Sequence, residues 1–79
     1  MSMKEENLLL TFGAHIKSLR LERGLSQESL ASLCGLDRTY ISGIERGRRN
    51  ISLINIIKLA YSLDVPPEKL LKFNMEGST

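Results

Sequence analysis

The fold is decided at residues 25–50, which read L-S-Q-E-S-L-A-S-L-C-G-L-D-R-T-Y-I-S-G-I-E-R-G-R-R-N. Apolar residues recur at helical spacing on both sides of Gly35, and they form one inner face only if the chain turns sharply there. Glycine can adopt the positive φ that such a turn requires. The stretch therefore predicts two helices, over about 27–34 and 38–46. Their shared inner face consists of Leu30, Ala31, Cys34, Leu36, Ile41 and Ile44.

The residues at the ends of these two helices support the prediction. Ser26 and Asp37 stand at the N-cap positions, where a side-chain oxygen can accept a hydrogen bond from a free backbone N–H. Gly47 can end the second helix. Gly43 lies inside that helix, which indicates either the close approach of another group or a glycine that is merely tolerated.

Apolar residues recur at helical spacing in three further segments, which predicts helices over about 7–23, 53–63 and 67–73. Gly24 can end the first of these helices, and Ser52 can cap the second. Residues 1–6 and 75–79 show no packing pattern, and we expect them to be flexible ends. The predicted fold class is all-α, a compact bundle of five short helices in a single domain over residues 1–79.

Length and composition fit one small globular domain. A chain of 79 residues can bury a single core, but an isolated monomer of this size is only marginally stable, so dimerisation would supplement it. The net charge of +2 is too small to indicate nucleic acid by itself. No apolar run approaches the ~18 residues that cross a bilayer, and no signal peptide is recognisable. We therefore expect a cytoplasmic protein, and in a bacterium the cytoplasm is also where the chromosome lies.

The sequence lacks the patterns of catalysis and of metal binding. His15 and Cys34 are the single histidine and cysteine, so neither has a second ligand at zinc spacing, and Cys34 fits an apolar core position. No nucleophile stands with a base, and paired carboxylates and phosphate-binding glycine loops are missing. We expect neither an enzyme nor a cofactor, a metal or a small-molecule ligand.

The outer face of the helix over 38–46 begins with Arg38, Thr39, Tyr40 and Ser42. A cation, hydroxyls and a phenol at the start of a helix suit a polar, anionic partner, and double-stranded DNA is the leading candidate. We expect these side chains to read bases, and Arg38 can bind O6 and N7 of guanine with two hydrogen bonds. A phosphate contact or a solvated side chain is the alternative for Arg38. Tyr40 could instead pack its ring over the helix of 27–34 and expose only its hydroxyl.

Basic and amide side chains flank that face, and we expect them to bind phosphates. Gln27 lies at the first turn of its helix, where backbone N–H groups and a side-chain amide can hold a phosphate together. The arginines after the second helix could each neutralise a phosphate and release counterions, although solvated arginine loops are common. The predicted phosphate-binding residues are Gln27, Ser26, Arg46, Arg48, Arg49 and Asn50.

A wider pattern within residues 12–73 consists of Gln27, Leu30-Ala31, Gly35-Leu36, Ile41, Ile44-Glu45 and Gly47. This pattern resembles the helix-turn-helix of the Cro and phage-repressor family, often called the Xre family. Residues 37–53 read D-R-T-Y-I-S-G-I-E-R-G-R-R-N-I-S-L, which is more specifically similar to the controller proteins of bacterial restriction-modification systems. This string is more informative than a bare helix-turn-helix.

The resemblance implies a phage-repressor-like fold in a homodimer that binds a pseudo-palindromic operator, with the helix over 38–46 of each subunit in the major groove. It also implies control of restriction-modification genes, including activation of its own gene and repression once a second dimer binds an adjacent site. RNA polymerase is a further candidate partner. Arg20 and Glu45 resemble a structural ion pair that ties the first helix to the end of the third.

The family likewise implies roles for individual residues. Thr39 and Tyr40 match positions that touch DNA, Gln27 matches a phosphate-binding glutamine, and Arg49 matches a DNA-facing basic position. Separately from the resemblance, late apolar residues could form either part of the core or a two-fold dimer patch. The candidate dimer residues are Tyr61, Leu70, Leu71 and Phe73.

Two other functions remain open from the sequence. A phage or plasmid repressor, or an antitoxin, would use the same fold, and neighbouring genes would separate these from a restriction-modification controller. A helical protein-interaction module would instead bind a protein through its apolar C-terminal face, with the arginines merely solvated.

Overall fold

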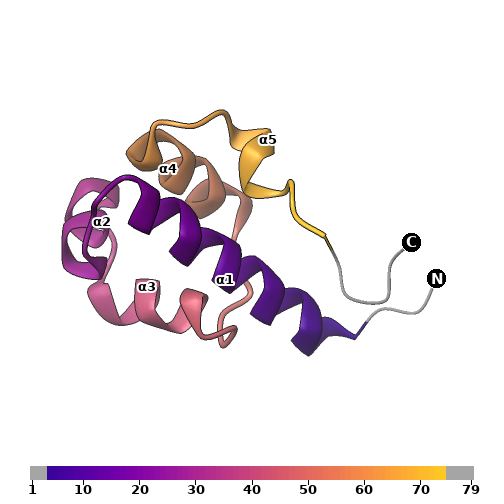
Figure 1. Ribbon diagram of the computed structural model, residues 1–79. Coiled ribbons are helices and arrows are strands. Elements are labelled where there is room, and N and C mark those ends of the chain that lie inside the picture. The colour runs from indigo at the N-terminus through magenta and orange to yellow at the C-terminus, as the bar shows by residue number, and fades with distance from the viewer. Residues whose placement is uncertain (1–3, 75–79) are drawn as a thin grey trace.

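The structure is a computed structural model that describes residues 4–74 as five α-helices and no strand, which confirms the predicted all-α class (Figure 1). The helices are α1 (Glu5–Glu22), α2 (Gln27–Cys34), α3 (Arg38–Glu45), α4 (Leu53–Leu63) and α5 (Pro67–Leu70). None of the described helices is long and apolar enough to cross a membrane. Residues 1–3 and 75–79, which include most of the predicted flexible ends, lie outside the described residues.

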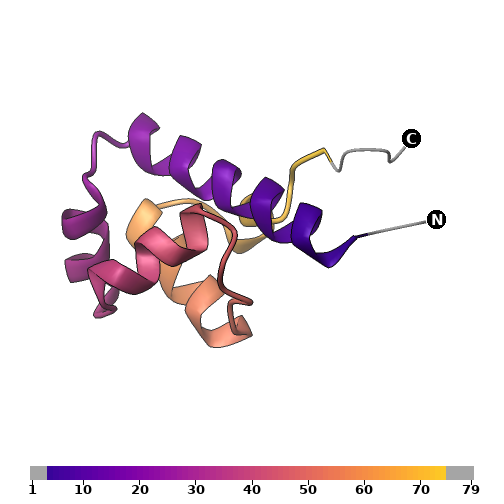
Figure 2. The ribbon, with the colours of Figure 1, turned by 90° about the horizontal axis from the view of Figure 1, so that it is seen from below.

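The long helix α1 crosses the whole molecule and supports the others. In Figure 1 it runs between α3 on its lower side and the pair α4 and α5 on its upper side. It contacts α3 and α5, while α2 contacts both α3 and α4 and so closes the bundle at the other end. Figure 2, seen from below, shows α3 leading into the loop that precedes α4. Arg38 and Thr39 in the first turn of α3 are exposed, so this side of the helix is free of other helices.

One apolar core holds the helices together. Its buried residues are Phe12, Ile16, Leu19, Leu30, Ala31, Cys34, Ile41, Ile44, Leu59, Ala60, Leu63 and Leu70. The inner face predicted for α2 and α3 lies in this core, except that Leu36 in the turn is half-buried and packs against its edge. Burial of apolar area at about 25 cal/mol per Å² is the main force that fixes the angle between α2 and α3.

The turns and caps explain where the helices start and stop. The Ser26 and Ser52 hydroxyls accept hydrogen bonds from the backbone N–H groups of Ser29 and Asn55, at 3.0 and 3.2 Å. Gly35 adopts φ 68°, the left-handed conformation that the turn requires. Asp37 occupies the N-cap position of α3 but makes no side-chain cap bond, so that part of the prediction is wrong.

The Asp37 backbone carbonyl accepts hydrogen bonds from the N–H groups of Tyr40 and Ile41, so the Tyr40 N–H is satisfied without the side-chain carboxylate. A negative charge at this position still favours the positive end of the helix dipole.

Two helix ends differ clearly from their predicted positions. Helix α1 begins at Glu5, not at 7, because glutamates in its first turn interact favourably with the helix dipole. Helix α5 ends at Leu70, not at 73, because Phe73 leaves the helix and packs edge-on against Phe12, with 6.0 Å between ring centroids. The ends of α1 at Glu22 and of α3 at Glu45 fall one residue earlier than predicted, a shift that frayed last turns commonly show.

Gly13 sets how closely α1 approaches α3. It is buried, and a Cβ at this position would collide with the Ile44 carbonyl oxygen and lie 2.8 Å from the Glu45 carbonyl oxygen. These carbonyls belong to the last turn of α3, so backbone packs directly on backbone at the crossing. The absence of a side chain here brings the end of α3 against α1.

We predict that Gly13→Ala destabilises the protein by about 1–3 kcal/mol because the new methyl group overpacks this crossing. At an exposed position inside a helix, Gly→Ala instead stabilises a protein by about 1 kcal/mol. The sign of the stability change therefore tells a packed crossing from an exposed position. Urea unfolding followed by circular dichroism measures the change, with Ser18→Ala on the exposed side of α1 as the control. A higher urea midpoint for Gly13→Ala would contradict the prediction.

Candidate nucleic-acid interface

The N-terminal half of α3 presents the predicted base-reading residues. Arg38 and Thr39 are exposed, and Ser42 and Tyr40 are half-buried. Arg38, Ser42 and Arg46 follow one another at four-residue steps, so they line a single stripe of the helix. The free side of α3 therefore carries a guanidinium group at each end and hydroxyl groups between them.

Tyr40 is anchored from two sides. Its ring packs against the edge of the core, and its hydroxyl accepts a hydrogen bond of 3.1 Å from Nδ2 of Asn55 in α4. The guanidinium carbon of Arg49 lies 5.4 Å from the ring centroid, which is within the range of a cation–π contact. The ring is thus partly in the core, and the hydroxyl, which the alternative in the sequence analysis left exposed, is held by α4. Sequence analysis missed Asn55, because a lone amide in a first turn carries no pattern.

Gly43 gives room to Arg49. A Cβ on Gly43 would lie 3.0 Å from Cγ and 3.4 Å from Nε of Arg49, closer than nearly all real contacts of a Cβ atom. Of the two explanations offered by the sequence, close approach is therefore right, and the approaching group is the chain's own arginine.

The loop after α3 concentrates positive charge beside this face. Arg46, Arg48, Arg49 and Asn50 are all exposed. The loop is shaped by Gly47 at φ 73° and by a 2.8 Å hydrogen bond from the Arg48 N–H to the Gly43 carbonyl. Within residues 4–74, none of these three arginines forms an ion pair with a carboxylate. Their charges are therefore free to attract an anion.

A buried ion pair joins α1 to the last residue of α3. Arg20 donates from Nε to Oε2 of Glu45 at 2.6 Å and from Nη2 to Oε1 at 3.0 Å. The two side chains are only 8% and 3% exposed. Hydrogen bonding to Glu45 raises the pKa of the Arg20 guanidinium, which therefore keeps its positive charge. This is the ion pair that the sequence resemblance implied.

Two further groups complete this network. Arg20 also donates from Nη1 to the Leu25 carbonyl at 2.8 Å, which fixes the turn before α2. Gln27 donates from Nε2 to Oε1 of Glu45 at 3.1 Å, a structural contact that sequence analysis did not foresee. Gln27 is half-buried, so part of its side chain is still accessible. Its predicted contact with a phosphate stays a prediction.

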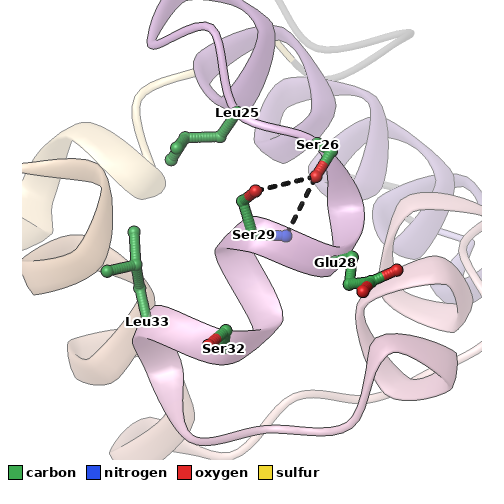
Figure 3. Close-up of a pocket in the computed structure, with 6 residues that line it drawn as sticks. All are labelled: Leu25, Ser26, Glu28, Ser29, Ser32 and Leu33. Carbon is green, nitrogen blue, oxygen red and sulfur yellow. Dashed lines mark hydrogen bonds between the residues drawn. The ribbon is translucent and has the colours of Figure 1, made fainter.

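Ser26 is committed to the cap of α2. Figure 3 shows its hydroxyl oxygen bonded both to the backbone nitrogen and to the hydroxyl of Ser29. These residues line an open depression together with Leu25, Glu28, Ser32 and Leu33. A phosphate contact by Ser26 itself therefore remains a prediction, and the exposed helix start beside it is the more available donor.

The candidate dimer residues divide into two groups. Leu70 is fully buried in the core, so its assignment to a dimer patch is wrong. Phe73 is half-buried, with its ring against Phe12 and His15, so its place in a dimer patch stays a prediction. Tyr61 and Leu71 are exposed.

Leu53 and Ile54 in the first turn of α4 are also exposed, and neither was predicted to lie in the dimer patch. Leu53 continues the helical spacing of Ile57 and Ala60, so spacing alone could not tell which side of α4 faces solvent. Together with Tyr61 they give α4 an uncovered apolar side.

His15 and Cys34 contact other helices of the bundle. Nε2 of His15 donates to the Lys69 carbonyl at 2.7 Å and so joins α1 to α5. Cys34 is buried beside α4, and burial raises the pKa of its thiol. In the part of the chain that the structure describes, no group of three or more His, Cys, Asp or Glu side chains could hold a metal ion.

The sequence was compared with protein families and with known proteins. The family model described as Helix-turn-helix matches residues 16–70. The chain is 49% identical to Control protein C.BamHI from Bacillus amyloliquefaciens over 73 residues, which cover 91% of this chain and 90% of that relative.

Solved structures agree with the sequence comparison. The restriction-modification controller protein C.AhdI from Aeromonas hydrophila superposes with a TM-score of 0.77 at 56% identity, covering 78% of this chain and 94% of the other. SinR, a master regulator for biofilm formation solved in complex with DNA, superposes with a TM-score of 0.74 at 37% identity, covering 77% and 98% of the two chains.

We predict that Arg20→Met destabilises the protein by about 3–5 kcal/mol because Glu45 would stay buried without its partner. Asp64→Asn is the control, since it breaks the exposed Arg23–Asp64 pair, whose side chains are 41% and 90% exposed. That change should cost no more than about 1 kcal/mol.

The double variant Arg20→Met/Glu45→Leu should be more stable than Arg20→Met, because it removes the buried unpaired charge. Thermal and urea unfolding measure all three variants. A loss for Arg20→Met as small as that for Asp64→Asn would contradict a buried, structural pair.

Proposed function

The chain belongs to the helix-turn-helix family and, within it, to the restriction-modification controller proteins, and from this we propose that it binds a pseudo-palindromic operator as a homodimer. It is a DNA-binding transcription regulator of restriction-modification genes. The operator, the dimer and the control of its own gene are the proposed parts.

One observation carries the proposal: the free side of α3 begins with exposed Arg38 and Thr39 and is bordered by the exposed arginines of the next loop. The major groove of B-form DNA admits an α-helix, and its base edges offer acceptors to a guanidinium group. We propose that Arg38 reads guanine and that Thr39, Tyr40 and Ser42 contact neighbouring bases or their methyl groups.

Phosphate contacts would set the register of α3 in the groove. Exposed cations in the loop can replace condensed counterions on the DNA backbone, which gives affinity without sequence information. Gln27 lies on the other side, at the N-terminal end of α2, where free N–H groups suit a phosphate oxygen. The proposed phosphate-binding residues are Gln27, Ser26, Arg46, Arg48, Arg49 and Asn50.

We place the dimer contact on α4. Leu53, Ile54 and Tyr61 are 73%, 69% and 83% exposed, and half-buried Ile57 lies between them on the same side of the helix. In a two-fold dimer, this patch on one subunit would pack against the same patch on the other subunit and become buried. Exposed Leu71, after α5, remains a separate candidate. A small domain with one core gains stability from such a contact.

Regulation would follow from protein concentration. A dimer at the first site would activate transcription, with RNA polymerase as the partner, and a second dimer on an adjacent site would repress the chain's own gene. We propose that the protein acts in the cytoplasm, where the bacterial chromosome lies, and that it acts by binding and not by catalysis.

Fluorescence anisotropy tests the proposal, with a duplex from upstream of the chain's own gene compared with a random duplex at the same salt concentration. We predict that Arg38→Ala costs about 1–3 kcal/mol on the upstream duplex and little on the random one. Arg49→Ala should weaken both and reduce the slope of log affinity against log salt by about 1. Equal affinity of the wild-type protein for both duplexes would refute the proposed function.

The dimer face makes a separate prediction. Ile54→Glu should raise the dimer dissociation constant at least about tenfold, because the contact would bury an unpaired carboxylate. Leu21→Glu is the matched control, since Leu21 is an exposed leucine of α1 and not one of the α4 patch residues. Sedimentation velocity over a concentration series measures both. An unchanged dimer constant for Ile54→Glu would exclude this face.

A further inference from the structure

The hydrogen bond between Asn55 and Tyr40 joins the exposed part of α3 to the start of α4. Asn55 is half-buried, and its backbone N–H is fixed by the Ser52 cap at 3.2 Å. Its side-chain Nδ2 then donates to the Tyr40 hydroxyl oxygen at 3.1 Å. The amide therefore stands on a capped first turn of α4 and holds the phenol hydroxyl from there.

The direction of this hydrogen bond determines what Tyr40 can offer. A phenol hydroxyl has one hydrogen to donate and lone pairs to accept, whereas an amide NH₂ can only donate. Because Asn55 donates to the Tyr40 oxygen, the Tyr40 hydrogen is left free for another partner. The hydroxyl is thus presented to its surroundings as a donor.

DNA offers hydrogen-bond acceptors that such a donor can bind. Phosphate oxygens, N7 and O6 of guanine and O4 of thymine are all acceptors. We propose that Asn55 is a positioning residue that makes Tyr40 a hydrogen-bond donor to DNA. This inference rests on the proposed function, and it adds a residue on α4 that itself touches no base.

The same arrangement also places Arg49. The guanidinium group lies over the Tyr40 ring, and its side chain passes over Gly43, where no Cβ stands in the way. A phenol that lost its anchor would change the ring orientation and with it the surface on which Arg49 rests. Asn55 thereby acts on two groups that face the proposed DNA site.

Asn55→Asp reverses the direction of the hydrogen bond with little change in shape. A carboxylate only accepts, so the Tyr40 hydroxyl would donate to Asp and could no longer donate to DNA. The added charge needs a control, which is Ser52→Asp: it places the same charge three residues earlier and keeps an N-cap residue. Aspartate also suits the first turn of a helix, so both variants are expected to fold.

The experiment uses the duplex that the wild-type protein enriches most from a random-sequence pool, and a scrambled duplex of the same length. The readout is the ratio of the two dissociation constants at one salt concentration, which cancels a general charge effect. Asn55→Asp and Tyr40→Phe should each lower this ratio about fivefold to tenfold. Ser52→Asp should weaken both complexes alike and leave the ratio unchanged.

Combining the variants separates positioning from general damage to the fold. Adding Tyr40→Phe to Asn55→Asp should cause no further loss, because the hydroxyl is already diverted from DNA. Adding Tyr40→Phe to Asn55→Ala should still lower the ratio, because there the hydroxyl can still reach DNA.

The inference would be overturned if Asn55→Asp had the same ratio of dissociation constants as the wild-type protein. It would also be overturned if Tyr40→Phe caused the same further loss in the Asn55→Asp and the Asn55→Ala proteins. Either result would leave the proposed function intact. Failure of the wild-type protein to enrich any sequence would overturn both.

Discussion

The buried ion pair between Arg20 and Glu45 is the contact on which the position of α3 depends. It ties the last residue of α3 to the middle of the bundle, and its two other hydrogen bonds reach the turn before α2 and the first residue of α2. Gly13 adds close backbone packing of α1 on the same end of α3. The C-terminal end of α3 is thus fixed, and its N-terminal end projects with Arg38 and Thr39 exposed.

This arrangement separates stability from recognition along one short helix. Ile41 and Ile44 on the inner side belong to the core, while the outer stripe of Arg38, Ser42 and Arg46 contributes nothing to it. Tyr40 lies between the two sides, with its ring on the core and its hydroxyl held by Asn55. A rigid scaffold of this kind reduces the conformational entropy that side chains lose when they bind DNA. A larger part of the free energy of each contact then contributes to the affinity.

The sequence was sufficient for the elements whose signal is local. The Gly35 turn, the Ser26 and Ser52 caps and the apolar spacing of α2 and α3 each follow from residues within one or two turns of each other. Three other features depend on contacts between distant segments. Gly13 looks neutral in a sequence because its role is the missing Cβ, and Leu70 could not be distinguished from a surface leucine until α5 was placed against the core. Asn55 has meaning only beside Tyr40.

The central claim is that DNA lies against the N-terminal half of α3 and the arginine loop, and it is tested most directly by amide chemical shifts. ¹H–¹⁵N spectra of the labelled protein would be recorded during titration with a duplex that it enriches from a random pool. The account predicts the largest shifts at Gln27, at residues 38–43 and at residues 46–50, with little change at Leu21 or at the end of α2. Shifts concentrated around Leu71 and the end of α4, with residues 38–43 unchanged, would contradict it.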